Sequence, residues 1–257
     1  MTTFVSDLDG TLLASDASVS DFTRQVIAVV SDSHEVVLAT GRPPRLVSGF
    51  AEAFPSVTSV VCANGAFHLD LHSGVITQLG TIIEPAAHQM VRAIRNAHPT
   101  AGFAVETITG HRREFGYRSH YDVPDRMKGT IDEILEGGVG KILIHLDEPV
   151  NEKRATEFAT LVGELGVVTV SNPTFYEVAP PGTSKASAVA ALDLPGETVA
   201  YGDMPNDITL LEWADLGVAV ANADEQVRLT AQCVLDQTNN EDAVAHHMIK
   251  LLGLSLP

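Results

Sequence analysis

Short apolar runs alternate with amphipathic segments in the first third of the chain. Residues 3–6, 35–39 and 59–63 are nearly continuous apolar runs of strand length, rich in β-branched side chains. Between them, the apolar positions of 22–30 and 44–54 recur at helical spacing. Buried strands separated by helices are typical of a parallel sheet that is covered on both faces. We therefore predict a doubly wound, Rossmann-like α/β domain.

The same alternation returns near the C-terminus. Residues 198–201 and 216–220 have the composition of buried strands. The segment between them predicts a helix that ends at Trp213, whose ring we expect in the core. An amphipathic segment closes the chain, and we expect Asn240 to cap its helix. This region therefore belongs to the same sheet as the N-terminal third.

The middle of the chain has a different pattern. Helix-like segments at 87–94 and 155–165 are mixed with strand-like runs at 141–145 and 167–170, and glycine-rich turns interrupt the region. We interpret it as a separate α+β domain inserted into the first. The predicted parts are residues 1–81 and 181–257 for the α/β core and residues 82–180 for the insertion.

Composition limits the class of protein. The 257 residues include 33 Asp and Glu against 16 Lys and Arg, a formal net charge of -17. Such a chain is repelled by nucleic acid and by anionic membranes, so we expect neither as a partner. Cys62 and Cys233 are too few for a disulfide framework, and no apolar run reaches membrane-spanning length. With no secretory signal, we expect a reduced cytoplasmic protein, and the sequence leaves the oligomeric state open.

The strongest chemical signal is Asp7-Leu8-Asp9-Gly10-Thr11, directly after the first strand. Ligands of open parallel sheets bind at the carboxyl ends of the strands, where both carboxylates would lie. Gly10 permits a tight turn and brings backbone N–H groups close to an anion. An Asx turn would explain one aspartate but not two. We therefore predict a functional role for this turn.

A second signal follows the next strand, at Thr40-Gly41-Arg42. A hydroxyl, a glycine N–H and a guanidinium together suit a phosphoryl group. The alternative is a helix cap at Thr40 beside an ordinary surface arginine.

The third signal is Lys185, which opens a helix after Gly182-Thr183-Ser184. A cation at a helix N-terminus opposes the helix dipole, which favours an anionic partner. A solvent-facing lysine is the alternative interpretation.

The fourth signal is Gly202-Asp203-Met204-Pro205-Asn206-Asp207, again just after a strand. Clustered carboxylates are costly unless a cation joins them, and oxygen ligands without His or Cys indicate Mg²⁺. An N-terminal capping box at Asp207 would leave Asp203 and Asn206 unexplained.

In order and spacing, these four blocks resemble the four signature motifs of the haloacid dehalogenase (HAD) superfamily. Four further features resemble its Cof-type phosphatase subfamily with a C2-type cap: Ala63-Asn64-Gly65-Ala66, the Gly-Asp-x-x-Asn-Asp form of the fourth motif, the segment Gly217 to Ala223, and the insertion of roughly 100 residues between the second and third motifs. The resemblance implies that the insertion is the cap. Ala186, where relatives often carry glycine, is a departure for which we expect no catalytic consequence.

The resemblance implies a role for each motif residue. Asp7 would be the nucleophile that forms an aspartyl-phosphate, and Asp9 would be the general acid and base. The other residues would bind the phosphoryl group, the metal or the rest of the substrate. The implied phosphate ligands are Leu8, Gly10, Thr40, Gly41, Lys185 and Asn206; the implied metal ligands are Asp7, Asp9 (through its carbonyl oxygen), Asp203 and Asp207; Arg42 and Asn64 are candidates for substrate specificity.

We therefore expect a Mg²⁺-dependent phosphomonoester hydrolase that acts on small phosphorylated metabolites, with sugar phosphates as the favoured class. A sugar-phosphate mutase of the same superfamily is the first alternative, and a non-catalytic module that binds Mg²⁺ and phosphate is the second. Basic residues at 110–113 and 117–120 of the insertion could contact the substrate, but a solvated hairpin is the favoured interpretation.

Overall fold

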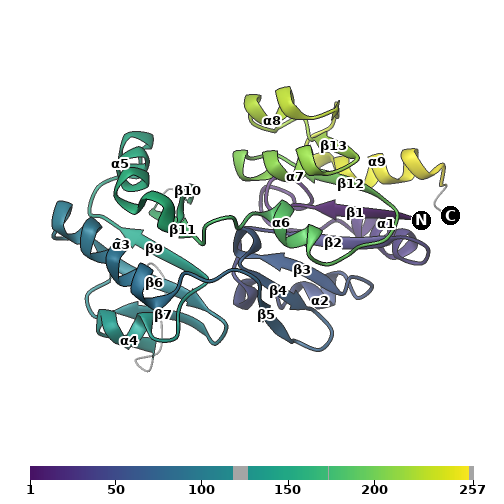
Figure 1. The fold of residues 1–257 in the computed structure, drawn as a ribbon. Helices are drawn as coiled ribbons and strands as arrows, with labels where there is room; N and C mark the ends of the chain where they lie inside the picture. The colour runs from purple at the N-terminus through teal and green to yellow at the C-terminus, as the bar shows by residue number, and fades with distance from the viewer. Residues whose placement is uncertain (118–126, 173, 255–257) are drawn as a thin grey trace. The chain divides into compact units, whose positions relative to one another are not determined.

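The computed structural model describes residues 1–117, 127–172 and 174–254. The chain divides into two compact units (Figure 1). Unit 1 joins Met1–Ile76 to Ser184–Pro257, and unit 2 is Thr77–Thr183. No helix in the described ranges is long and apolar enough to cross a membrane.

Unit 1 is built on a sheet that has eight strands in the described residues. The boundary between the two units falls within its edge strand, Ile76–Gln78. Its strands are β1 (Thr2–Ser6), β2 (Glu35–Ala39), β3 (Ser59–Cys62), β4 (Phe67–Asp70), β5 (Ile76–Gln78), β12 (Glu197–Gly202), β13 (Leu216–Ala219) and β14 (Cys233–Val234). They lie in the order β14-β13-β12-β1-β2-β3-β4-β5. The pairs from β14 to β3 are parallel, and β4 turns back antiparallel to β3.

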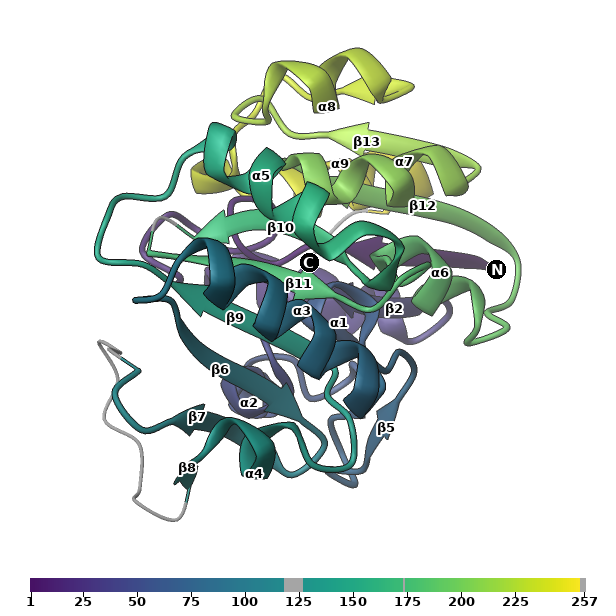
Figure 2. The same cartoon turned by 60° about the vertical axis from the view of Figure 1, so that its left-hand side comes forward.

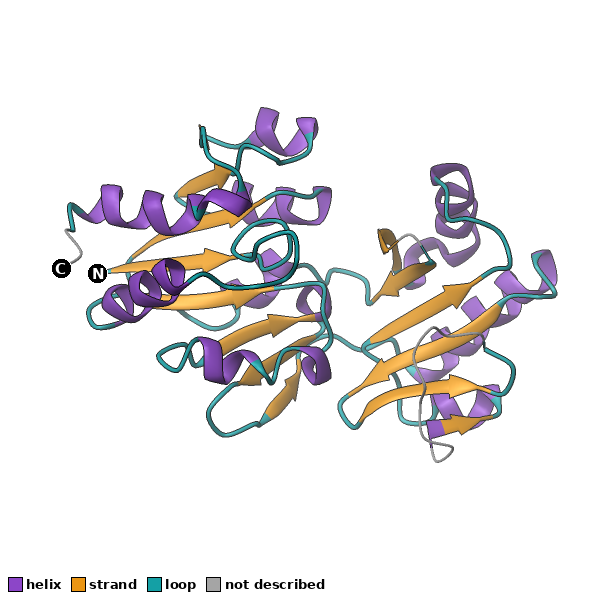
Figure 3. Cartoon of the chain, turned by 180° about the vertical axis from the view of Figure 1, so that it is seen from behind, coloured by secondary structure: helices purple, strands orange, loops and turns teal. Residues whose placement is uncertain are grey.

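Helices cover both faces of this sheet. Figures 1 and 3, taken from opposite sides, show α6 and α7 in front of the strands in one view and α1 and α9 in front in the other. Buried side chains from the strands and from both sets of helices form one core. The unit 1 helices are α1 (Asp21–Ser31), α2 (Phe50–Ala53), α6 (Lys185–Ala190), α7 (Ile208–Trp213), α8 (Glu225–Thr230) and α9 (Ala243–Leu252).

Unit 2 has its own sheet and its own core. Its strands are β6 (Gly102–Thr107), β7 (Gly110–Glu114), β8 (Lys128–Gly129), β9 (Lys141–His145), β10 (Val167–Asn172) and β11 (Phe175–Ala179), in the order β10-β11-β9-β6-β7-β8. All pairs are antiparallel except β7 with β8. The helices are α3 (Glu84–Ala97), α4 (Ile131–Leu135) and α5 (Glu152–Val162), and Figure 2 shows α3 and α5 over the sheet.

The predicted fold class, a doubly wound α/β core with an inserted α+β part, is confirmed. Three local predictions are wrong. The helix expected over 44–54 is broken into a 3₁₀ turn, Pro44–Leu46, and the short helix α2, with a turn at 47–49 between them. Asn240 lies inside a 3₁₀ turn, and α9 begins after Asp242, whose backbone is left-handed. Trp213 is 36% exposed at the end of α7 rather than in the core.

Candidate active site

Three buried carboxylates converge at the carboxyl ends of β1 and β12. Asp7 directly follows β1, Asp203 directly follows β12, and Asp207 ends the 3₁₀ turn Pro205–Asp207. Since β1 and β12 are parallel neighbours, their ends lie side by side. One carboxylate oxygen from each of the three aspartates lies within 4.8 Å of the others.

Lys185 lies against two of these carboxylates. Its Nζ donates to Asp7 Oδ1 at 2.5 Å and to Asp207 Oδ1 at 2.6 Å. The side chain has no solvent exposure, so the solvent-facing interpretation is wrong. Lys185 opens α6, and the Ser184 hydroxyl caps this helix by accepting from Ser187 N. The position of Lys185 at the start of α6 therefore places its ammonium group between the carboxylates of Asp7 and Asp207.

Burial and neighbouring charges raise the pKa of two of these aspartates, Asp7 and Asp203. Burial raises the pKa of Asp7 to about 8, because it outweighs the attraction of Lys185 and is reinforced by Asp207 and Asp203. Burial, together with Asp207, raises the pKa of Asp203 to about 6. Although burial opposes it, the neighbouring carboxylates raise the pKa of Lys185. One ammonium facing three carboxylates leaves an excess of negative charge, and an all-oxygen donor set fits a hard divalent cation.

The turn after β1 depends on glycine. Gly10 has φ +80°, and a Cβ there would lie 2.3 Å from Asp203 Oδ2. Thr11 Oγ1 donates to Asp203 Oδ1 at 3.0 Å. The Leu8 carbonyl accepts from the N–H groups of Leu12 and Leu13, and this closes the turn. The turn that carries Asp7 is thus joined to Asp203 by close contact and a hydrogen bond.

Asp9 lies outside the carboxylate cluster. Its side chain is 52% exposed, and two N–H groups of Arg42 bind it: Nε donates to Oδ2 at 2.7 Å and an Nη donates to Oδ1. Arg42, predicted as a candidate specificity residue, therefore contacts the predicted acid/base. This pairing was not expected from the sequence.

Thr40, Asn64 and Asn206 form a polar group between the ends of β2, β3 and β12. The Thr40 hydroxyl accepts from Arg42 N at 3.1 Å, so it closes a turn rather than capping a helix. The Thr40 carbonyl accepts from Asn64 N at 3.0 Å. Asn206 Nδ2 donates to Asn64 Oδ1 at 3.1 Å, whereas the buried Asn64 Nδ2 has no hydrogen-bond partner in the described part of the chain.

Asn64 is held by an unusual backbone. Ala63 and Asn64 both have left-handed φ, 52° and 56°, a region that costs a non-glycine residue free energy. The amide of Asn64 lies against Gly41, where a Cβ would come within 3.2 Å of Asn64 Oδ1. The small residue at 41 and the strained turn together place this amide beside Gly41 and within reach of Asn206.

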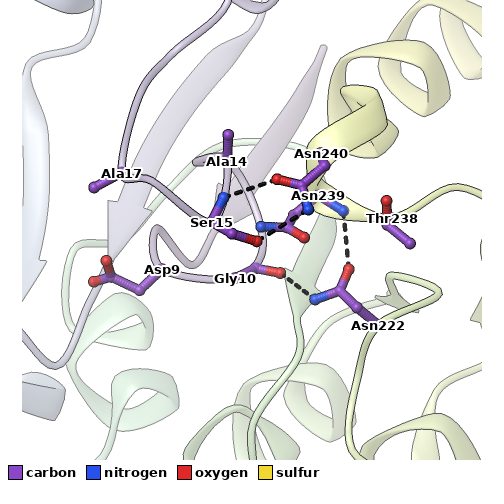
Figure 4. Close-up of a pocket in the computed structure, with 9 residues that line it drawn as sticks. All are labelled: Asp9, Gly10, Ala14, Ser15, Ala17, Asn222, Thr238, Asn239 and Asn240. Atoms are coloured by element: carbon purple, nitrogen blue, oxygen red, sulfur yellow. Dashed lines mark hydrogen bonds between the residues drawn. The ribbon is translucent and has the colours of Figure 1, made fainter.

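A pocket of about 460 Å³ lies beside Asp9 and Gly10 (Figure 4). Asn222 Nδ2 donates to Gly10 O at 2.8 Å, and Asn222 Oδ1 accepts from Asn239 N. On the other side of the pocket, Asn240 exchanges hydrogen bonds with Ser15, which explains why it does not cap α9. The Asp9 carboxylate points away from these asparagines (Figure 4). Of the residues that line this pocket, Asp9, Gly10 and Asn222 lie in segments that the sequence analysis related to the site, whereas Ser15 and Asn239 do not.

The basic residues predicted in the insertion contact other groups of unit 2. His111 Nδ1 lies 3.0 Å from Glu106 Oε1, Arg112 donates to the carbonyl of Glu136, and Arg113 donates to that of Tyr117. Positions 118–120 of the second predicted cluster lie outside the described residues. The sequence did not indicate the buried ion pair between Lys141 and Glu177, 2.8 Å apart.

Comparison with known proteins gives the family. The sequence profile of the haloacid dehalogenase-like hydrolases matches residues 4–248, so the chain belongs to this family. It is 33% identical over 245 residues to the 5-amino-6-(5-phospho-D-ribitylamino)uracil phosphatase YcsE of Bacillus subtilis, covering 93% of this chain and 91% of that one. It is 26% identical to the pyridoxal phosphate phosphatase YbhA of Escherichia coli, covering 93% and 94%.

Solved structures agree on the fold. The structure of a HAD subclass IIB sugar phosphatase superposes with a TM-score of 0.80 at 18% identity and covers 98% of this chain and 99% of that one. The predicted HAD membership, of the Cof-type subfamily, and the predicted class of enzyme, a HAD-type phosphatase, are confirmed.

Proposed function

We propose that this protein is a Mg²⁺-dependent phosphomonoester hydrolase that works through an aspartyl-phosphate at Asp7. The observation that carries the proposal is the buried cluster in which Lys185 Nζ bonds both Asp7 and Asp207 while Asp203 completes the carboxylate set. A carboxylate beside a fixed ammonium is suited to accept a phosphoryl group, because the cation offsets the charge that the two anions bring together.

In the first step, a carboxylate oxygen of Asp7 attacks phosphorus in line with the ester bond. The new Asp7 O–P bond forms as the bond from phosphorus to the substrate oxygen breaks. Asp9 gives a proton to the departing alkoxide. The products of this step are the free alcohol and a phosphorylated Asp7.

In the second step, water attacks the same phosphorus and Asp9 accepts its proton. The bond between phosphorus and Asp7 breaks, which releases inorganic phosphate and restores the carboxylate. Asp9 therefore alternates between acid and base, and each cycle returns both aspartates to their starting forms.

Several groups of unit 1 would hold the phosphoryl oxygens. They are the backbone N–H groups of the turn Leu8–Gly10 and of Gly41, the Thr40 hydroxyl, the Lys185 ammonium and the Asn206 amide. Asn64 fits the same role, since its buried Nδ2 lacks an acceptor among the described residues. Donors around a phosphoryl group stabilise the charge spread over its oxygens in the transition state.

The cluster fits Mg²⁺ by its donor chemistry. Asp7, Asp203 and Asp207, with the carbonyl oxygen of Asp9, would hold the ion, and all are oxygen ligands. Bound there, Mg²⁺ supplies charge neutralisation for the phosphoryl group. A cation bound there would lower the raised pKa of Asp7 and Asp203, because it favours the ionised form of both carboxylates.

We propose small phosphorylated metabolites, such as sugar phosphates, as substrates. The support is the relative named for a phosphorylated ribityl compound, which shares a third of its residues with this chain. We propose further that residues 82–180 act as a cap that selects among phosphate esters. Exchanging this insertion with that of the Bacillus subtilis relative should change the preferred ester and leave the dependence on Asp7 intact.

The test is phosphate release from a panel of sugar, nucleotide and carboxylic-acid phosphates, with Mg²⁺ and with EDTA. Turnover that requires Mg²⁺ and is absent from Asp7→Asn and Asp7→Ala protein supports the proposal. No release, combined with isomerisation of a sugar phosphate primed by a bisphosphate, would identify a mutase. Binding of Mg²⁺ and phosphate without either reaction, unaffected by Asp7→Ala, would identify a non-catalytic module.

A further inference from the structure

We infer that Arg42 is the positioning residue for the acid/base Asp9, and that it acts on the departure of the alcohol rather than on recognition of the substrate. This inference rests on the proposed function and adds a role to it. It starts from the two-point contact in which the Arg42 guanidinium holds both oxygens of the Asp9 carboxylate. A planar guanidinium that meets a carboxylate in this way fixes orientation as well as distance.

Arg42 is itself held from two directions. Its backbone is bound at both ends: its N–H donates to Thr40 Oγ1 at 3.1 Å, and its carbonyl accepts from Ala63 N at 2.9 Å. Its guanidinium carbon lies 5.5 Å from the centre of the Phe50 ring, a cation–π distance. The side chain that grips Asp9 therefore comes from an anchored turn and lies over an aromatic surface.

The position of Asp9 suits the acid of an in-line reaction. The nucleophile and the leaving oxygen lie on opposite sides of phosphorus, so an acid packed among the buried carboxylates would be on the wrong side. Asp9 is instead half exposed and absent from the cluster formed by Asp7, Asp203 and Asp207. The two hydrogen bonds from Arg42 hold the Asp9 carboxylate in this position. Removing the guanidinium should therefore allow the carboxylate to move away from the leaving oxygen.

This role has a signature that a structural role lacks. An alkoxide needs a proton to leave, whereas p-nitrophenolate is stable enough to leave without one. A positioned acid contributes roughly 10²–10⁴-fold, so we expect Arg42→Gln to lower kcat about 30-fold or more for the best alkyl phosphate of the panel, with less than about threefold loss for p-nitrophenyl phosphate. Arg42→Lys keeps the charge without the fork and should give an intermediate loss with the same selectivity.

Asp9→Asn provides the reference for this experiment, since it removes the acid directly. The double variant Asp9→Asn/Arg42→Gln should be no slower on the alkyl phosphate than Asp9→Asn alone, because residues that act as a unit are not additive. Phe50→Leu should reproduce the selectivity weakly, by about two- to fivefold. Arg24→Gln, which removes a cation from an exposed pair with Asp21, is the matched control and should behave like wild type.

The two proposals fail differently. If the wild-type protein releases no phosphate from any ester, the proposed function is wrong. If wild type turns over and Asp9→Asn shows the leaving-group selectivity, but Arg42→Gln slows both substrates equally or adds its full loss to that of Asp9→Asn, the inference about Arg42 is overturned. A rise in KM for the alkyl phosphate at unchanged kcat would also overturn it, and would return Arg42 to substrate recognition.

Discussion

Lys185 is fully buried between Asp7 and Asp207, so its charge and theirs are mutually dependent. Removing one partner of a buried ion pair leaves the other without compensation, which costs about 3–5 kcal/mol. Lys185→Met should therefore lower the free energy of unfolding by an amount of that order at neutral pH and abolish turnover. Urea unfolding measures the first effect. Lys153→Met, an exposed lysine of α5, is the control, and an equal loss there would contradict the argument.

Asn64 allows stability and ligand binding to be separated. Its backbone is left-handed and its buried Nδ2 has no acceptor among the described residues, so the residue carries two local costs. Asn64→Gly removes both costs, although it also removes the bond to Asn206. We expect unchanged or higher thermal stability, together with about tenfold weaker inhibition by inorganic phosphate, the loss of roughly one hydrogen bond to a charged group. Lower stability with normal phosphate inhibition would show that Asn64 is only structural.

At the scale of elements, the end of β12 is where packing and chemistry meet. A Cβ on Gly202 would lie 2.4 Å from the Cβ of Asp207, so the strand must end in glycine for Asp207 to reach Lys185. Gly202→Ala should displace Asp207 and weaken Mg²⁺ binding by at least about tenfold, which titration calorimetry would measure. Gly49→Ala, with no neighbour within 4 Å, should bind Mg²⁺ normally. Equal affinity in both variants would show that Asp207 does not hold the ion.

The elements also show what the sequence could and could not predict. Apolar runs and motif positions predicted which strands and turns carry Asp7, Thr40 and Asp203, because these depend on local pattern and on the rule that parallel strands end together. The contacts of Asp9 with Arg42 and of Asn64 with Asn206 were not predicted. They join turns 33 and 142 residues apart and depend on side-chain orientation, which no periodicity encodes.

At the scale of the whole molecule, three buried aspartates are gathered at one site of an acidic chain. The net charge of -17 is spread mainly over exposed carboxylates, several of which have a lowered pKa through hydrogen bonds to nearby backbone, such as Glu133 and Asp215. Asp7 and Asp203 have a raised pKa instead, because burial dominates there. Metal-free protein should therefore hold protons at this cluster that the unfolded chain has already released.

The sign of the pH dependence follows from that difference. The folded pKa of Asp7 is about 8 and its ordinary value is 3.8, so stability from this group is present below the lower value and is lost as pH rises towards 8. The stability contributed by Asp203 is lost in the same way as pH rises towards the folded pKa of this group, about 6. Burial lowers the pKa of His68 and His247, so their contribution to the stability of the protein increases as pH rises towards the ordinary histidine pKa of 6.5. A comparison with Asp7→Asn cancels the histidine contribution.

Mg²⁺ should replace those protons, so its stabilising effect should grow with pH. Cation binding to protonated carboxylates must first displace a proton, which weakens the apparent affinity at low pH. We expect saturating Mg²⁺ to raise the Tm of the wild-type protein more at about pH 8 than at about pH 6, while the difference largely disappears in Asp7→Asn. Differential scanning fluorimetry at several Mg²⁺ concentrations measures both shifts. A Tm shift that is the same at both pH values in wild type would mean that the cation does not bind at Asp7, and the charge argument for the site would fail with it.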